Sequence, residues 1–475
     1  FNTVVSRMRV SPFIMCVRWD YPLMRPSGRP KDDPYRINLS RLSFSALAVW
    51  FDVTSLYAWN RPVTGVTRVE LECARVFLES RPLTVQFVQF DSHRHKFLAL
   101  DPSDLSERVA FLETLEGRPS GKGRRVLKKL LASLPDRIQT NVLRLSSLPR
   151  RLSQRLRFWR SSDLSSQVRG GIFQDGDTFI SLGFDLSSQK FKAIAQIRKR
   201  SDLRVMTCCH DLIPWVRSDL TLDRIIGPFL EYINELLEIS DHVVCNSCCT
   251  AKDLSRYLEL KARRPSISVI RLGSKVGFNP ELPPSLSIAT ILEQPYVLFV
   301  STIERRKNHE ILLDAYHGLL AEGLSNLPKL VFVGMQGWGA EQFFQKLSSD
   351  PAVADHVRLL HHVSDHDLSH LYRRSLFTVY PSLYEGWGLP VAESLAQGKF
   401  CIASQAASIP EVGGDLVEYC APDDARAWGA AIHAFANDPQ ALMAREERIR
   451  MEYHPPEWRD TVHQIMQVAI PQGVT

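Results

Sequence analysis

The sequence predicts an α/β protein with two domains, each built around a parallel β-sheet. Short apolar runs that are typical of buried strands alternate with helical patterns from about residue 46 onward. A chain of 475 residues is too long for one hydrophobic core. The pair Pro283-Pro284 separates two such alternating regions and indicates a linker. We therefore expect two Rossmann-like domains that face each other across a cleft.

The expected strands and helices divide between two halves of the chain. Strands of the first half are expected at Leu47–Phe51, Val85–Phe90, Thr178–Leu182, Arg204–His210, His242–Asn246 and Ile267–Leu272. Strands of the second half are expected at Tyr296–Val300, Lys329–Val333, Val357–Leu360, Leu376–Tyr380 and Phe400–Ala403. A turn is expected at Thr64–Arg68, followed by a helix over Val69–Leu78. The expected domains are residues 46–285 and 286–455, preceded by an extension of unknown role at residues 1–45.

Composition places the chain among ordinary globular proteins, with 44% hydrophobic and 23% charged residues. No apolar run approaches the 18 or more residues of a membrane-spanning helix. Arg7, Arg9, Arg18 and Asp20 interrupt the apolar stretch that a signal peptide needs. Nine cysteines in a chain of this length are no disulfide framework and indicate reduced thiols. The expectation is a cytoplasmic protein that is at most peripheral at the inner face of a membrane.

One segment carries most of the positive charge. Residues 118–169 hold 14 Lys or Arg against 2 Asp, a local charge of +12 in a chain whose net charge is +6. Apolar residues, including Phe158 and Trp159, interleave with the basic ones. This pattern is typical of a segment that binds an anionic membrane surface or an anionic lipid-linked substrate. A solvent-exposed insertion is the alternative, and nucleic acid is not an expected partner.

Two glutamates form the most informative motif. Glu385 follows an apolar run with strand character, and a Gly-Trp-Gly turn leads to Leu389-Pro390, where a helix is expected to begin. Glu393 then lies one turn into that helix. The glycine amides and the helix N-terminus between the two carboxylates suit an anionic ligand. The motif indicates a nucleotide-sugar site, with amides for the diphosphate and carboxylates for hydroxyls. An exposed turn before an ordinary helix is the alternative.

Basic and small residues follow two other expected strands of the second half. Arg305, Arg306 and Lys307 follow the strand Tyr296–Val300, and they supply the forked donors and the point charge of a diphosphate site. A solvated basic loop would have the same composition. Gly334 follows the next strand and permits close approach of a ligand to the backbone, although a plain turn explains it equally.

The first half supplies further candidates at strand ends. His210 ends an expected strand and can bond a sugar hydroxyl or transfer a proton, unless it is a structural histidine. Thr64-Gly65 forms a flexible turn that is suited to approach a substrate. Cysteines near residues 208 and 245 raise the alternative of a zinc site, but their spacing matches no zinc-binding pattern and no metal is expected.

Taken together, these motifs resemble the family 4 retaining glycosyltransferases of the GT-B fold, and bacterial mannosyltransferases that build surface polysaccharides in particular. The resemblance extends from about Phe51 to Trp458, apart from the basic segment. It is carried by the motifs Phe51-Asp52-Val-Thr-Ser-Leu56, Thr64-Gly-Val-Thr-Arg68, His210-Asp-Leu-Ile-Pro214, Cys245-Asn-Ser247, Glu304-Arg-Arg-Lys-Asn308, Glu385 to Glu393, Ser408-Ile-Pro-Glu411, Gly413-Gly414 and Pro422-Asp-Asp424. In this fold the last helix often returns to the first domain, and residues 456–475 carry a suitable apolar face.

The resemblance also implies a role for each candidate. Either Arg305 or Arg306, together with Lys307, would bind the donor diphosphate, and Glu385 would face the donor hexose. His210 would lie by the transferred sugar, and Glu393 would bind the ribose. The remaining implied contacts are the amides of Gly386, Trp387, Gly388 and Leu389 near the sugar and phosphate, and Thr64-Gly65 near the acceptor and phosphate.

The expected reaction is transfer of a hexose, with mannose favoured, from a nucleotide-diphosphate sugar such as GDP-mannose to a glycan or lipid-linked acceptor. Members of the family retain the anomeric configuration and need neither a metal nor another cofactor. Two alternatives keep the same fold. One is a nucleotide-sugar epimerase, and the other is a non-catalytic membrane-associated scaffold.

Overall fold

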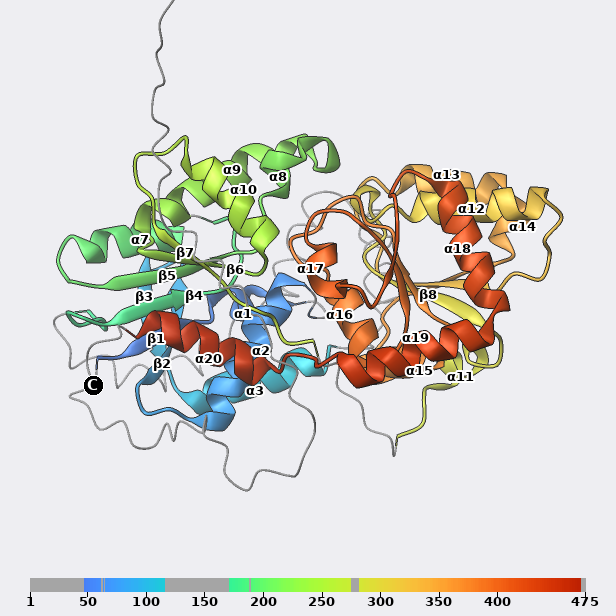
Figure 1. Cartoon of the computed structure of the whole chain (residues 1–475). Coiled ribbons are helices and arrows are strands. Elements are labelled where there is room, and N and C mark those ends of the chain that lie inside the picture. Colours follow the sequence, from blue (N-terminus) through green and yellow to red (C-terminus); the bar gives the residue numbers. More distant parts are fainter. Residues whose placement is uncertain are drawn as a thin grey trace, which may run out of the picture.

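A computed structural model describes residues 47–60, 63, 65–115, 171–187, 189–274 and 282–470. The described chain forms two lobes, drawn mainly in blue and green and in yellow to red (Figure 1). Three of the features expected from the sequence lie outside the described residues: the extension at residues 1–45, Thr64 and the basic segment at residues 118–169. No helix of the described part is both long and apolar enough to cross a membrane.

The first lobe is built on a seven-stranded sheet in the order β3-β2-β1-β4-β5-β6-β7. Its strands are β1 (Val49–Asp52), β2 (Val85–Asp91), β3 (Lys96–Leu100), β4 (Thr178–Ser181), β5 (Arg204–Cys209), β6 (His242–Cys245) and β7 (Ser266–Val269). All neighbours pair in parallel except β2 and β3. Its helices are α1 (Thr54–Ala58), α2 (Val66–Ser80), α3 (Pro102–Glu113), α7 (Gln189–Arg198), α8 (Ile213–Val216), η2 (Ser218–Leu220), α9 (Asp223–Ile239) and α10 (Cys248–Leu258).

The second lobe is built on a parallel sheet in the order β10-β9-β8-β11-β12-β13. Its strands are β8 (Tyr296–Val300), β9 (Lys329–Val333), β10 (Val357–Leu360), β11 (Thr378–Tyr380), β12 (Cys401–Ser404) and β13 (Glu418–Cys420). Its helices are α11 (Leu286–Ile291), η3 (Arg305–Lys307), α12 (His309–Ala321), α13 (Glu341–Ser349), α14 (Pro351–Ala354), α15 (Asp365–Arg374), α16 (Leu389–Ala396), α17 (Ile409–Gly413), α18 (Ala425–Asn437) and α19 (Pro439–Glu452).

The two parallel sheets confirm the predicted fold class. Strands such as β8 are buried along nearly their whole length because helices cover both faces of each sheet, which is why they read as continuous apolar runs. Helix α20 (Trp458–Ala469) then returns from the second lobe to pack on the first (Figure 1). Its Thr461 hydroxyl donates to the Arg271 carbonyl over 2.8 Å, and Val462, Ile465 and Ala469 enter the core of the first lobe.

Several expected boundaries were wrong by a few residues. The turn predicted at Thr64–Arg68 is shorter, because α2 already begins at Val66 after Gly65, whose φ of +54° suits glycine. The strand predicted at Ile267–Leu272 is shifted to Ser266–Val269, and the one predicted at Leu47–Phe51 begins only at Val49. The edge strands β3 and β13 were missed, since both are short and only partly buried.

Candidate functional site

The candidate residues of the second lobe gather where its strand order reverses. Strands β8 and β11 are neighbours, but the chain leaves β8 toward β9 and leaves β11 toward β12 on the other side. The crevice at the carboxyl ends of two such strands is the usual ligand site of an open α/β sheet. Arg306 and Lys307 follow β8, and Glu385 follows β11. Topology therefore brings the basic loop and the first glutamate together.

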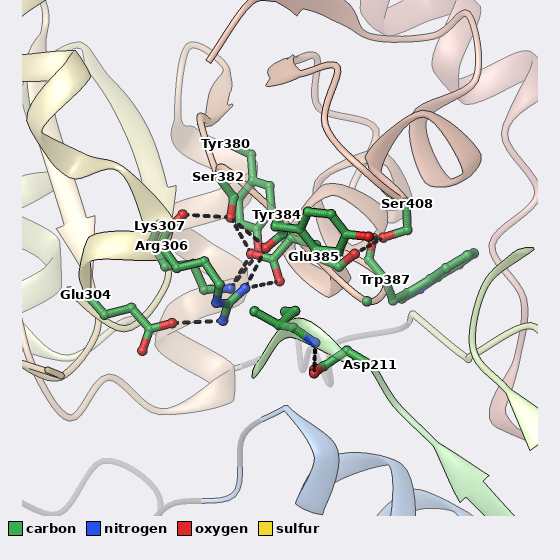
Figure 2. A network of polar contacts seen from close by, with 12 residues as sticks. Asp211, Glu304, Arg306, Lys307, Tyr380, Ser382, Tyr384, Glu385, Trp387 and Ser408 are labelled. Atoms are coloured by element: carbon green, nitrogen blue, oxygen red, sulfur yellow. Dashed lines mark hydrogen bonds and ion pairs between the residues drawn. The ribbon is translucent and has the colours of Figure 1, made fainter. Parts of the chain in front are cut away.

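Glu385 is the centre of a buried polar cluster (Figure 2). Its Oε2 lies 2.7 Å from an Arg306 guanidinium nitrogen, and its Oε1 lies 2.5 Å from the Lys307 ammonium. The hydroxyls of Tyr380 and Ser382 also donate to Oε1, over 3.0 and 2.6 Å. Both carboxylate oxygens of Glu385 are therefore held in place.

Opposite charges dominate the electrostatics of this cluster. Burial alone would raise the pKa of Glu385, but the charges of Arg306 and Lys307 outweigh it and lower that pKa from 4.5 to about 2. Arg306 is bound further by Glu304 and by the Tyr384 carbonyl, each over 2.8 Å. Burial and the neighbouring Arg306 lower the pKa of Lys307 despite the opposing charge of Glu385. The cluster thus holds two cations close to one ionised carboxylate.

Backbone contacts fix the loops that carry this cluster. Asn308 has a φ of +61°, and its side-chain amide donates to the carbonyls of Pro381 and Pro422 over 3.1 and 2.7 Å. The Ser408 hydroxyl lies 2.9 Å from the carbonyl oxygens of both Glu385 and Trp387. The Asn308–Pro381 bond joins the loop after β8 to the loop after β11, and the Ser408 contacts hold the latter loop against the start of α17. The cations and the carboxylate therefore keep their mutual placement.

The Gly386–Leu389 segment runs from this cluster toward the first lobe. Gly388 has a φ of +114° and precedes α16, which begins at Leu389. A Cβ added to Gly386 would lie 2.1 Å from the His210 carbonyl oxygen, so only glycine permits this approach of the two lobes. Trp387 packs against the cores of both lobes, and within the described chain its buried indole nitrogen has no hydrogen-bond partner.

His210, at the end of β5, places its backbone carbonyl against Gly386, while its imidazole makes contacts within the first lobe. Its Nε2 lies 2.7 Å from the Leu182 carbonyl oxygen, and its Nδ1 lies 3.8 Å from the Cys208 sulfur. Burial lowers the pKa of His210, which favours the neutral imidazole. Because a carbonyl only accepts hydrogen bonds, Nε2 carries the proton and the lone pair lies on Nδ1.

Glu393 lies on α16 and contacts both lobes. Its Oε2 accepts from the Tyr372 hydroxyl over 2.8 Å, and its Oε1 lies 3.3 Å from a guanidinium nitrogen of Arg68 on α2. The second terminal nitrogen of Arg68 pairs with Asp365 at the start of α15. Burial raises the pKa of Glu393, and the charge of Arg68 opposes this effect.

Among the described residues, the other candidates make no hydrogen bond or ion pair with Glu385. Arg305 is exposed and Arg306 alone of the two arginines pairs with Glu385 in the described structure. Gly334 packs so closely on the end of β8 that an added Cβ would lie 1.8 Å from the Ser301 carbonyl oxygen. Packing therefore explains this glycine without a ligand. Gly65 is exposed before α2.

Cysteines at the ends of β5 and β6 do not make a metal site with their neighbours. Cys208, Cys209 and Cys245 are buried and not disulfide-bonded. Burial raises the pKa of the Cys208 thiol, which disfavours the thiolate that zinc needs. Across the residues that the structure describes, no group of three or more His, Cys, Asp or Glu side chains is arranged to hold a metal ion.

Several cross-lobe contacts were not predicted from the sequence. The Glu411 carboxylate accepts hydrogen bonds from the amides of Cys248 and Cys249, both over 2.7 Å, at the N-terminus of α10. The Tyr384 hydroxyl donates to Asp253 over 2.5 Å. Glu411 belongs to a motif quoted above, but nothing local in the sequence indicates that its partner is a helix of the other domain.

Comparison with known protein families gives a match that lies within the second lobe. Residues 287–453 match the family model described as Glycosyl transferases group 1. The second lobe is a glycosyltransferase group 1 domain. This group 1 domain contains the whole Glu385 cluster as well as Glu393 and Asp365.

Curated relatives of this chain include two from Escherichia coli. The O-antigen chain mannosyltransferase B is 31% identical over 233 residues, which cover 48% of this chain and 60% of that protein. The serotype-specific mannosyltransferase WbdA is 28% identical over 238 residues, which cover 47% of this chain and 29% of that protein. The matches thus span less than two thirds of either relative.

Solved structures extend the likeness to both lobes. HepE of Anabaena, solved with UDP and glucose, aligns with a TM-score of 0.54 at 13% identity and covers 89% of this chain and 99% of that one. Sucrose-phosphate synthase of Thermosynechococcus elongatus aligns with a TM-score of 0.51 at 16% identity, covering 89% and 98%. At such identities the likeness establishes the fold, which is the GT-B arrangement predicted from the sequence.

Proposed function

We propose that this chain is a retaining glycosyltransferase that moves a hexose, preferably mannose, from a nucleotide-diphosphate sugar to a glycan or lipid-linked acceptor in surface polysaccharide synthesis. The observation that carries the proposal is the Glu385 cluster with Arg306 and Lys307 at the reversal of strand order, where the His210 carbonyl of the other lobe lies against Gly386. The group 1 domain and the names of the curated relatives support the reaction class and the sugar. The basic segment at residues 118–169 would then bind an anionic membrane surface or the lipid-linked acceptor.

The contacts of the site suit a reaction driven by positioning and charge. Arg306 and Lys307 would stabilise the leaving diphosphate, which is electrostatic stabilisation of the transition state. Glu385, whose ionised oxygens are already fixed, would accept hydroxyl hydrogen bonds from the donor hexose. The diphosphate itself would take the proton of the acceptor hydroxyl as the new glycosidic bond forms. We propose that the reaction needs no metal ion.

A transfer assay tests this proposal. The purified chain is incubated with GDP-mannose labelled in the sugar and with a mannose-terminated oligosaccharide acceptor. We expect Glu385→Ala and Lys307→Ala to lower transfer by about 100-fold or more, a loss typical of removing one transition-state contact. Glu418→Ala, which removes an exposed ion-pair partner of Arg445, is the matched control and should transfer like the wild type. Unchanged transfer in both site variants would refute the assignment.

Further arms of the assay separate the alternatives. The anomeric configuration of the product, read by NMR, tests retention, and a chelator that left the rate unchanged would agree with metal independence. Incubation of the donor without acceptor tests the epimerase, because only an epimerase would alter the sugar under those conditions. A thermal-shift screen against nucleotide-sugars tests the scaffold, since a ligand that binds the folded state raises the melting temperature. No shift with any donor would favour the scaffold.

A further inference from the structure

Arg68 crosses from the first lobe to the part of the second lobe where the proposed donor ribose would bind. It lies in the first turn of α2, and its two terminal nitrogens contact carboxylates on two different elements of the group 1 domain. One is Glu393 on α16, at 3.3 Å, and the other is Asp365 at the start of α15. The side chains of Arg68 and Glu393 are only 13% and 9% exposed. The guanidinium therefore spans two elements that belong to the other domain.

This contact sets the orientation of the Glu393 carboxylate. The two oxygens of Glu393 are held separately, one by Arg68 from the first lobe and one by Tyr372 from its own lobe. An ionised carboxylate offers about four acceptor positions. Arg68 and Tyr372 each use one, so acceptor capacity remains on both oxygens for the two adjacent hydroxyls of a ribose. The two contacts thus orient the Glu393 carboxylate and leave acceptor positions on it for a ligand.

Arg68 can supply this orientation only while the two lobes are close together. Both of its partners in the second lobe lie about 300 residues away in sequence, at separations of 297 and 325 residues. If the lobes move apart, Glu393 keeps Tyr372 but loses the cation that balances its charge. A buried carboxylate that loses its cation is destabilised in its ionised form. The ionised form is the better acceptor for hydroxyl groups.

We propose that Arg68 is a positioning residue that makes recognition of the donor ribose by Glu393 depend on closure of the cleft. The inference rests on the proposed function, because it assigns the ribose to Glu393. Arginine suits this task better than lysine, since its planar fork reaches two carboxylates at once whereas an ammonium is a single point of charge. Asp365 fixes the second arm of the fork and so defines the direction from which Arg68 approaches Glu393.

A double-mutant cycle measured by calorimetry tests the proposal, with GDP-mannose and, in a second series, UDP-glucose as the ligand. Arg68→Ala should weaken donor binding by about 10- to 100-fold, the usual range for one charge-assisted hydrogen bond. Glu393→Gln should weaken it by a similar factor, and the double variant should bind no worse than Glu393→Gln alone. Arg68→Lys should recover part of the loss. Arg263→Ala is the control, because Arg263 is a half-exposed arginine of the first lobe that pairs with Asp241 of its own lobe, and it should change binding by less than about 2-fold.

The possible outcomes separate the inference from the function on which it rests. If the losses of Arg68→Ala and Glu393→Gln multiply in the double variant, Arg68 acts independently of Glu393 and the proposal is overturned. If Arg68→Ala leaves donor affinity unchanged and only enlarges the radius of gyration in small-angle scattering, Arg68 joins the lobes and positions nothing, which also overturns it. If the wild type binds neither nucleotide-sugar, the proposed function itself fails.

Discussion

Replacing Glu385 by Gln should cost the folded protein about 3 kcal/mol at neutral pH. The substitution keeps the shape of the side chain but leaves Arg306 and Lys307, 16% and 12% exposed, without their common counter-charge. A fall in the pKa of Glu385 from 4.5 in the unfolded chain to about 2 in the folded one corresponds to about 3 kcal/mol. Removing one partner of a buried ion pair typically costs about 3–5 kcal/mol, which agrees in size.

The pH dependence of this loss has a definite sign. Because folding lowers the pKa of Glu385, its contribution to stability is fully present above about pH 4.5 and is lost as the pH falls toward about 2. The difference between wild type and Glu385→Gln should therefore shrink in acid, because the wild type then gives up the same ionic contribution. Despite its burial, Arg306 has its pKa raised by Glu385 and Glu304, so it stays protonated throughout this range and does not change the sign.

Urea unfolding followed by tryptophan fluorescence, at about pH 7 and at about pH 3.5, measures both effects. The matched control is Glu418→Gln, whose pair with Arg445 spans 3.0 Å between side chains that are 40% and 36% exposed. An exposed pair of this kind contributes at most about 1 kcal/mol. A loss below about 1 kcal/mol for Glu385→Gln at neutral pH, or a loss that stays constant into acid, would refute the reasoning.

Three further predictions concern the cleft and the basic segment. Gly386→Ala should lower transfer by about 10-fold or more while the melting temperature changes little, because the added Cβ meets the His210 carbonyl oxygen only when the lobes are closed. Gly227→Ala is the control and should leave transfer intact, because a Cβ there meets nothing within 4 Å. The His210 imidazole should titrate by NMR below its usual 6.5, since burial disfavours its cation, and a midpoint at or above 6.5 would contradict that effect of burial. The full chain should sediment with anionic vesicles, and it should do so less at high salt. A chain that lacks residues 118–169 should not sediment, and its sedimentation would rule out that segment as the membrane contact.

The fold could be predicted because strands that are buried on both faces leave an unmistakable apolar run. Strands β8 and β9, which are buried along nearly their whole length, begin and end at the residues expected from the sequence. The edge strand β10 is only partly buried, but its apolar residues also placed it correctly. Edge strands such as β3 expose part of their length, so their composition resembles that of loops. Strand order was not expected in detail either, since pairing depends on contacts between distant residues rather than on local pattern.

In the candidate site too, local sequence pattern predicted some features, whereas others depend on contacts between distant residues. Motif and strand position were enough to place Glu385 near the basic loop, but they left open which arginine reaches it. That choice depends on the turn of η3 and on the left-handed backbone of Asn308, which direct Arg306 toward Glu385 and leave Arg305 exposed. The partners of Glu393 include Arg68, which lies 325 residues away, so no local pattern indicates the contact.

The two glutamates of the motif therefore differ in how their surroundings are assembled. Glu385 receives both of its cations from its own domain, so its carboxylate is oriented by folding of the group 1 domain alone. Glu393 receives its cation from the other domain and reaches the same degree of order only when Arg68 approaches. In the proposed reaction, the hexose and diphosphate end of the donor would meet a preformed site, while the ribose end would be fixed by closure. A donor bound to an open cleft would then lack its second anchor, and the same approach of the lobes that brings His210 to Gly386 would complete it.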